Sequence, residues 1–213
     1  MEATNDNSEN SSDLNRRMLA GDAAAMASFF EQQRPRLKKM VMLRMDRRLH
    51  ARIDPSDVLQ DTWLDCSRRF SDFAKQSSMS FFQWLRYLTS QRLIDLHRTH
   101  LGAAMRDASQ EVSLYQGGLP AASSMSLAEH LMGRVTSASD AAQRAEIQIR
   151  IQDALNSMDA VDREVLVLRH FELLTNEETA EALGLKKATA SLRYLKALKR
   201  LKSVLSATPG LFE

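Results

Sequence analysis

The chain has 213 residues, and its formal net charge of only +2 does not by itself indicate a nucleic-acid-binding protein. One cysteine excludes an internal disulfide framework and a multi-cysteine metal site, and no apolar run approaches the roughly 18 residues of a membrane span. Only 7 Gly and 4 Pro residues favour an all-α fold, and the polar, acidic N-terminus favours a cytoplasmic protein over a secreted one.

The N-terminal part combines a polar tail with a helical region whose charges fall in blocks. Residues 1–12 have little to bury and are expected to be disordered. Helical periodicity then runs from Asp13 to about His50, and Pro35 can start a new helix or bend a continuous one. Residues 1–33 carry six acidic residues against two arginines, and residues 34–48 carry seven basic residues against Asp46 alone; this alternation predicts several distinct charged surfaces.

Two longer helices are expected next. The segment 54–57 (DPSD) is a strong helix start, because Asp is a preferred N-cap and Pro a preferred first helical residue. This helix is expected to reach about Phe73, with Cys66 as a buried thiol. A polar loop over residues 74–79 separates it from a second helix, expected over Phe81–His100.

The first of these helices carries an acidic face. Asp54, Asp57 and Asp61 fall on one side of the helix, and Gln60 lies beside Asp61. Capping of the positive helix end explains the first two carboxylates. It does not explain Asp61, which lies two turns into the helix.

The second helix combines aromatic side chains with cations. This chemistry suits single-stranded nucleic acid, because bases stack on aromatic rings and phosphates pair with Lys and Arg. The residues concerned are Trp84, Arg86, Tyr87, Gln91, Arg92, His97 and Arg98. Core packing is the better explanation of Trp84, but not of the arginines. His97 and His100, without Glu or Cys partners, are a weak zinc signal, and phosphate contact is the simpler role.

The C-terminal half begins with a change of composition. Residues 102–144 are rich in Ala, Ser, Gly and Met and are expected to form a flexible linker, with a transient helix near Leu127–Leu131. A second helical domain is expected over 145–206, with helices near 145–157, 161–172, 176–183 and 187–205, before a short tail over 207–213. The two lobes are expected to fold separately.

The segment Asn176–Lys202 predicts a helix-turn-helix with its turn at Gly184. Seven Lys and Arg residues and no carboxylate lie between Lys186 and Lys202, whereas Glu172–Glu181 has four carboxylates and no cation. A helix-turn-helix places its second helix in the major groove, so this division of charge favours DNA binding. The inward stripe of the second helix is expected to be Ala190, Tyr194, Ala197, Leu198, Leu201 and Leu205.

Three runs in the first lobe carry a resemblance: Asp54–Trp63 (DPSDVLQDTW), Phe82–Arg86 (FQWLR) and Arg92–Arg98 (RLIDLHR). With the helix-turn-helix, they resemble regions two and four of the extracytoplasmic-function sigma factors of bacterial RNA polymerase. The resemblance implies a region-two domain over 13–101, a region-four domain over 145–206, and a promoter-recognition subunit that is not an enzyme and uses no cofactor or metal. The partners it implies are core RNA polymerase, promoter DNA and an anti-sigma protein.

The resemblance also implies three sets of contact residues. Core polymerase is bound by Asp54, Asp57, Gln60 and Asp61. The minus-ten element is melted and held by Lys75, Gln76, Ser77, Ser78, Trp84, Arg86, Tyr87, Gln91, Arg92, His97 and Arg98. The minus-thirty-five element is read by Lys186, Lys187, Thr189, Ser191, Leu192, Arg193, Lys196 and Arg200.

The recognition helix departs from the commoner pattern of that family. A basic residue and then Ser more often precede the position of Arg193, where this chain has Ser191 and Leu192. Leucine can touch a thymine methyl group but cannot make a bidentate contact to guanine. Leu192 and Leu195 can alternatively pack on another protein, so the promoter sequence that is read stays open.

One alternative from another class is a stand-alone helix-turn-helix regulator whose N-terminal lobe binds a ligand or forms a dimer. Such a protein binds duplex DNA tightly without polymerase, usually at a palindromic site. It leaves the acidic helix and the aromatic, basic helix without a function, which is why the sigma-factor interpretation is preferred.

Overall fold

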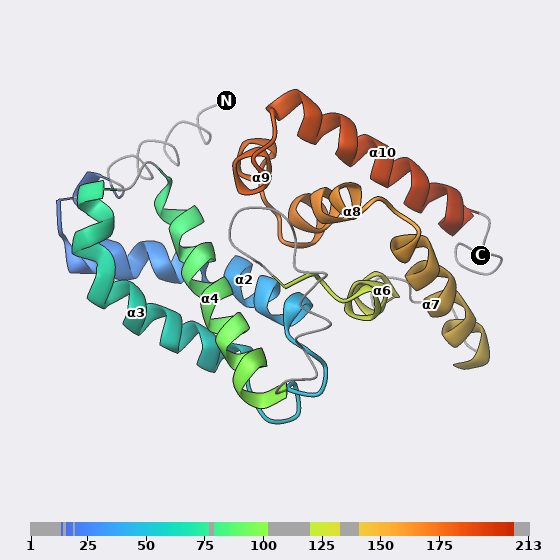
Figure 1. The fold of residues 1–213 in the computed structure, drawn as a ribbon, viewed down its shortest axis with the longest axis horizontal. Coiled ribbons are helices and arrows are strands. Elements are labelled where there is room, and N and C mark those ends of the chain that lie inside the picture. The colour runs from blue at the N-terminus through green and yellow to red at the C-terminus, as the bar shows by residue number, and fades with distance from the viewer. Residues whose placement is uncertain are drawn as a thin grey trace, which may run out of the picture.

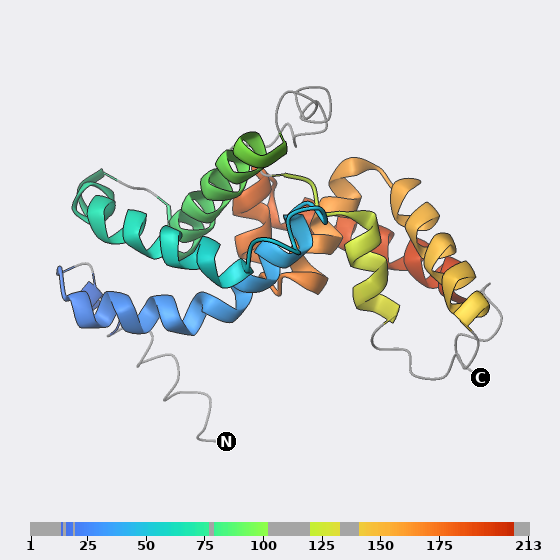
Figure 2. The same cartoon turned by 90° about the horizontal axis from the view of Figure 1, so that it is seen from below.

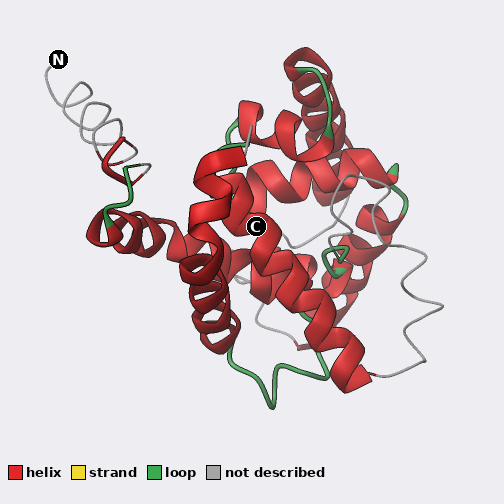
Figure 3. Cartoon of the chain, turned by 60° about the vertical axis from the view of Figure 1, so that its left-hand side comes forward, coloured by secondary structure: helices red, strands yellow, loops and turns green. Residues whose placement is uncertain are grey.

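A computed structural model describes residues 14, 16–18, 20–76, 79–101, 120–132 and 141–206. Its elements are α2 (Ala23–Arg44), α3 (Pro55–Gln76), α4 (Phe81–Leu101), α6 (Ser124–Met132), α7 (Ala141–Asn156), α8 (Ala160–Leu166), the π-helical turn η3 (Val167–Phe171), α9 (Asn176–Leu183) and α10 (Lys187–Ser206). These residues contain no β-strand (Figure 3), so the predicted all-α class is confirmed. None of their helices is long and apolar enough to cross a bilayer.

The N-terminal lobe consists of α2, α3 and α4, which lie together at one end of the molecule (Figure 1). The carboxylate of Asp22 caps α2 by accepting hydrogen bonds from the amides of Ala24 and Ala25 at 2.9 and 3.1 Å. Pro35 lies inside α2, so the region up to Arg44 is one continuous helix rather than two. The helical residues on both sides of Pro35 therefore outweigh the backbone hydrogen bond that proline removes.

An aromatic cluster joins α3 to α4. Phe73 and Trp84 stack with their ring centroids 4.5 Å apart, and Phe70 meets Phe81 edge to face at 5.5 Å. Trp84 is 7% exposed, as core packing predicted. Cys66 is also buried, and this burial raises the pKa of its thiol to about 12.

The C-terminal lobe consists of α6 to α10, with α10 packed across α7, α8 and α9. Thr175 and Glu178 form a reciprocal capping box at the start of α9. At its end, Gly184 adopts φ +61°, the left-handed conformation that the predicted turn requires. Helix α10 begins three residues later.

Part of the expected linker is helical. Residues 124–132 form α6, and its buried side chains Leu127, Ala128 and Met132 join a core with Ile147 and Ile151 of α7. This apolar group forms one face of a helix, which packs once α7 offers a complementary face. Residues 141–144 of the expected linker form the first turn of α7, and residues 102–119 and 133–140 lie outside the described residues.

The two lobes are packed against each other. Helix α2 reaches from the N-terminal lobe towards α6 in two perpendicular views (Figures 1 and 2). Val165, Leu168, Leu174 and Leu183 of the C-terminal lobe belong to the same buried cluster as the core of α2, α3 and α4. The amide of Ser123 also donates to the carbonyl of Leu43 at 3.1 Å. The lobes that the sequence predicted to fold separately thus share a core in this conformation.

Candidate nucleic-acid and polymerase interfaces

The acidic face of α3 is exposed. Asp54, Asp57, Gln60 and Asp61 all reach solvent. The carboxylate of Asp54 accepts a hydrogen bond from the amide of Ser56 at 2.7 Å, and this bond holds the pKa of Asp54 below its usual range. Leu64 follows one turn later with 45% of its surface exposed. Its apolar side chain extends this face, and the sequence interpretation did not include it.

Asp61 has a partner on α4. Arg92 Nη2 lies 2.9 Å from a carboxylate oxygen of Asp61, and Arg92 Nε lies 3.4 Å from Asp65. This pair links a residue expected to bind polymerase to one expected to bind DNA. Because both side chains remain solvent-accessible, the pair contributes little to stability.

The residues expected to hold the minus-ten element differ in exposure. Tyr87 and Arg98 are exposed, and Gln91 and Arg92 are half-buried. Trp84, Arg86 and His97 are buried, so they cannot touch DNA in this conformation. Lys75 and Gln76 form the last turn of α3, whereas Ser77 and Ser78 lie outside the described residues.

His97 has a structural role here. Its Nε2 accepts a hydrogen bond of 3.1 Å from the amide of Asp46, which requires the neutral imidazole. Burial lowers the pKa of His97 and favours that neutral form. Within the described part of the chain, no group of three or more His, Cys, Asp or Glu side chains could hold a metal ion.

The basic helix α10 presents the predicted two faces. Ala190, Ala197 and Leu201 are buried, with Tyr194 and Leu198 half-buried beside them, and the side chain of Leu205 is outside the described set. The opposite side carries the cations Lys186, Lys187, Lys196, Lys199, Arg200 and Lys202. Leu192 and Leu195 are 68% and 61% exposed, so they face outward with these cations.

Three carboxylates outside α10 pair with its cations. Asp162, buried in α8, lies 2.6 Å from Arg193 Nη1 and 2.7 Å from Lys196 Nζ. Burial alone would raise the pKa of Asp162, but its bonds with Lys196 and Arg193 outweigh burial and lower it. Arg193 also pairs with Asp159 at 3.2 Å, and Lys187 pairs with Glu177 at 2.5 Å. The sequence interpretation did not identify Asp162, although it lies in the first turn of a predicted helix.

A second set of charges is buried between the lobes, and we call it the interlobe ion cluster: Arg44, Arg86, Glu164 and Glu172. Arg44 of α2 pairs with Glu164 and, at 2.6 Å, with Glu172. The other carboxylate oxygen of Glu172 lies 2.5 Å from Arg86 Nη1 of α4. Arg44 and Glu172 are fully buried, and burial would raise the pKa of Glu172, but the two guanidinium groups outweigh it and lower this pKa.

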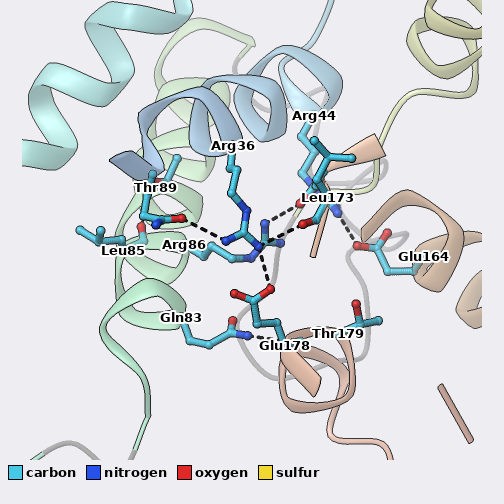
Figure 4. A network of polar contacts seen from close by, with 12 residues as sticks. Arg36, Arg44, Gln83, Leu85, Arg86, Thr89, Glu164, Leu173, Glu178 and Thr179 are labelled. Carbon is cyan, nitrogen blue, oxygen red and sulfur yellow. Dashed lines mark hydrogen bonds and ion pairs between the residues drawn. The ribbon is translucent and has the colours of Figure 1, made fainter. Parts of the chain in front are cut away.

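Arg36 makes a neighbouring contact between the lobes (Figure 4). Its guanidinium lies over the Phe82 ring, 3.9 Å from the centroid, and donates to Glu178 of α9 at 2.7 Å and to the carbonyl of Leu173 at 3.2 Å. Gln83 Nε2 donates to the carbonyl of Glu178 at 2.8 Å. Glu178 of α9 and Glu172, which precedes α9, therefore face basic residues of α2.

Comparison with known proteins agrees with this architecture. Residues 148–201 match the family described as Sigma-70, region 4. The RNA polymerase sigma-E factor of Streptomyces coelicolor is 37% identical over 68 residues, which are 32% of this chain and 38% of that protein. The matched part thus spans well under half of the curated relative.

Two solved structures are similar in fold. CnrH, in complex with the cytosolic domain of CnrY, has a TM-score of 0.50 and 19% identity, over 91% of this chain and 96% of its own. The sigma factor RpoE of Bartonella quintana, in complex with the anti-sigma factor NepR, has a TM-score of 0.46 and 16% identity, over 85% and 96%.

The helix-turn-helix lobe is a sigma-70 region 4 domain over residues 148–201. The resemblance of the chain to extracytoplasmic-function sigma factors is confirmed for that domain and for the all-helical fold.

Proposed function

We propose that this protein is a sigma factor, which binds core RNA polymerase and directs initiation at specific promoters. The observation that carries the proposal is the combination, on one chain, of a region 4 helix-turn-helix with an exposed cationic helix and a separate exposed acidic helix. A DNA-binding domain alone needs no acidic face elsewhere. A polymerase subunit needs one surface for the enzyme and another for DNA.

The proposed polymerase surface is the face of α3 formed by Asp54, Asp57, Gln60 and Asp61. These four side chains are exposed and project from a helix that is anchored by Thr62 and Cys66 on its buried side. Leu64 adds an apolar contact at the same face. A rigid helix with this pattern suits a helical partner of basic character.

The proposed minus-ten surface lies on α4 and the segment before it. Tyr87, Gln91, Arg92 and Arg98 are accessible and combine stacking with cationic contacts. Arg86 is covered by Glu172 of the C-terminal lobe and would need the lobes to move before it could reach DNA. His97 is held inside the N-terminal lobe by its hydrogen bond from the Asp46 amide. Trp84 supports this surface from the core.

The proposed minus-thirty-five surface is the outer side of α10. Lys186, Lys187, Lys196 and Arg200 supply phosphate contacts, and Thr189, Ser191 and Leu192 face the groove between them. Leu192 favours contact with a thymine methyl group.

Run-off transcription tests the proposal directly. Core polymerase would be incubated with a pool of promoter-length DNA fragments, with and without this protein, and the transcripts would be sequenced. We expect new discrete start sites only when the protein is present. Absence of both core binding and directed initiation would overturn the proposal, and tight palindromic DNA binding without polymerase would favour the stand-alone regulator.

A further inference from the structure

The outward face of α10 has an apolar centre. Ala188, Leu192 and Leu195 follow one another at i, i+4 and i+7, so they form one stripe along the first half of the helix. This stripe lies opposite the buried side of α10, and its two leucines are 68% and 61% exposed. Isolated exposed leucines are common on protein surfaces, whereas two on successive turns at the centre of a basic helix indicate a binding surface.

The charges around the stripe favour a polyanion as its partner. Helix α10 contains no Asp or Glu residue, and Lys196, Lys199 and Arg200 are exposed beside the stripe or beyond its end. The helix lies on the outside of the C-terminal lobe (Figure 1), where a long, rod-shaped partner can approach it. Charge complementarity therefore favours duplex DNA over an apolar groove of another protein.

The cations nearest the stripe are held by carboxylates of another element. Arg193 Nη1 lies 2.6 Å from Asp162 and 3.2 Å from Asp159, the N-cap of α8. Lys196 Nζ lies 2.7 Å from Asp162, which is only 3% exposed and cannot follow a cation outward. These bonds draw both cations towards one flank of α10. The leucines are left at the centre of its outward face.

We propose that α10 selects its DNA site through thymine methyl groups, which Leu192 and Leu195 contact in the major groove, and not through cation contacts to guanine. The inference rests on the part of the proposed function in which α10 reads duplex DNA, and it does not require that the chain bind polymerase. Arg193 and Lys196, on the flank of the helix, then contact phosphates rather than bases.

The spacing of the two leucines matches neighbouring base pairs. Three residues of α-helix advance about 4.5 Å along its axis, and successive base pairs lie roughly 3.4 Å apart along the duplex. The N-terminal residues of a recognition helix are those that meet base edges, so both leucines reach adjacent base pairs or pairs one step further apart. Thymine alone carries a methyl group on its major-groove edge, so leucine at these positions distinguishes thymine from the other bases.

Selection from a pool of random duplex DNA identifies the site. The pool would be presented to the full chain with and without core polymerase, and the bound fragments would be sequenced. We expect the enriched sites to share two thymines on adjacent base pairs or on pairs one step further apart. Enrichment of a guanine-rich site without such thymines would overturn the inference, as would no enrichment under either condition.

Replacement of thymine by uracil then tests the methyl groups themselves, because uracil lacks only the methyl and pairs in the same way. We expect each replacement to weaken binding by the parent protein about fourfold, the effect of one buried methyl group. Leu192→Ala should lose the discrimination between thymine and uracil at one of the two positions, and Leu195→Ala at the other. Equal binding of the thymine and uracil sites by the parent protein would contradict the role of the methyl groups.

Ile149→Ala is the matched control, since Ile149 of α7 is an apolar side chain with 58% exposure. It should keep the full preference for thymine. Leu192→Arg should change the selected base from thymine to guanine at one position, because arginine makes a bidentate contact to guanine. Melting curves on all variants check that they fold. Discrimination that survives in both folded leucine-to-alanine variants would show that these side chains do not read the methyl groups.

The same variants separate this inference from the sigma-factor function. If the chain alone selects sites with thymine but core polymerase does not capture it, the sigma-factor function fails and the reading of thymine stands. If Leu192→Ala and Leu195→Ala lose core polymerase and keep the discrimination, the stripe contacts protein and the inference is wrong.

Discussion

Arg44 and Glu172 form a fully buried ion pair of 2.6 Å although they are 128 residues apart in the chain. Each lies on a different lobe, so the pair exists only when the lobes are packed together. It joins the part of the chain proposed to bind polymerase to the part proposed to read duplex DNA.

Arg44→Ala should destabilise the packed protein strongly. The substitution leaves Glu164 and Glu172 buried without their shared partner, and breaking such a pair costs about 3–5 kcal/mol of unfolding free energy. Urea denaturation followed by circular dichroism measures this change. Arg98→Ala removes an exposed pair with Asp95 and should change stability by less than about 0.5 kcal/mol. Equal losses in the two variants would contradict the role given to the cluster.

Asp61→Lys should abolish binding to core polymerase with little effect on folding. Asp61 is exposed and its pair with Arg92 contributes at most about 1 kcal/mol. Affinity capture by core polymerase, with a melting curve on the same sample, separates the two effects. Glu31→Lys is the control, because it reverses an equally exposed carboxylate paired with Arg34 on α2. Loss of binding in both variants would indicate a general charge effect rather than a contact at α3.

Arg193→Ala should weaken promoter binding and make that binding less sensitive to salt. The affinity for core polymerase should not change. Asp162 and Asp159 orient this guanidinium in the first half of α10, where we expect a phosphate to share it. Loss of one phosphate contact lowers the slope of log K against log salt by about one. Binding of the protein with core polymerase to a promoter fragment, measured at several salt concentrations, gives this slope. Arg150→Ala, in an exposed pair on α7, should leave it unchanged.

His97 should make the protein less stable as the pH falls from neutrality. In the folded protein, burial lowers the pKa of His97 below its ordinary value of 6.5. As the pH falls, the unfolded chain therefore takes up a proton at a higher pH than the folded chain does. Stability is therefore complete above pH 6.5 and falls below it, by up to about 1.4 kcal/mol per pH unit. Denaturation at a series of pH values, compared with His97→Gln, isolates this effect, because glutamine can accept the Asp46 amide bond without titrating. Parallel pH profiles would show that His97 does not titrate as proposed.

The sequence correctly predicted those features that depend only on interactions between residues close together in the chain. The start of α3 at Pro55, the left-handed turn at Gly184 and the inward stripe of α10 all follow from capping, backbone freedom and periodicity within a few residues. The core position of Trp84 follows from the same periodicity.

Features that depend on the pairing of distant segments could not be predicted in this way. The sequence showed a basic block over residues 34–48 and an acidic stretch over Glu172–Glu181, but not that they meet. Arg86 was therefore expected on a DNA surface, whereas the structure places it beneath Glu172. Likewise, α6 packs only because α7 offers it an apolar face. The assignments of individual DNA and polymerase contacts stay predictions.

Gly184 has a consequence for finding relatives of this domain. A Cβ at this position would meet no described atom within 4 Å, so the requirement for glycine comes from its φ of +61° and not from lack of space. Asparagine visits that conformation far more readily than other side chains. A chain with asparagine at the turn can thus build the same motif, and a search that insists on glycine there will overlook it.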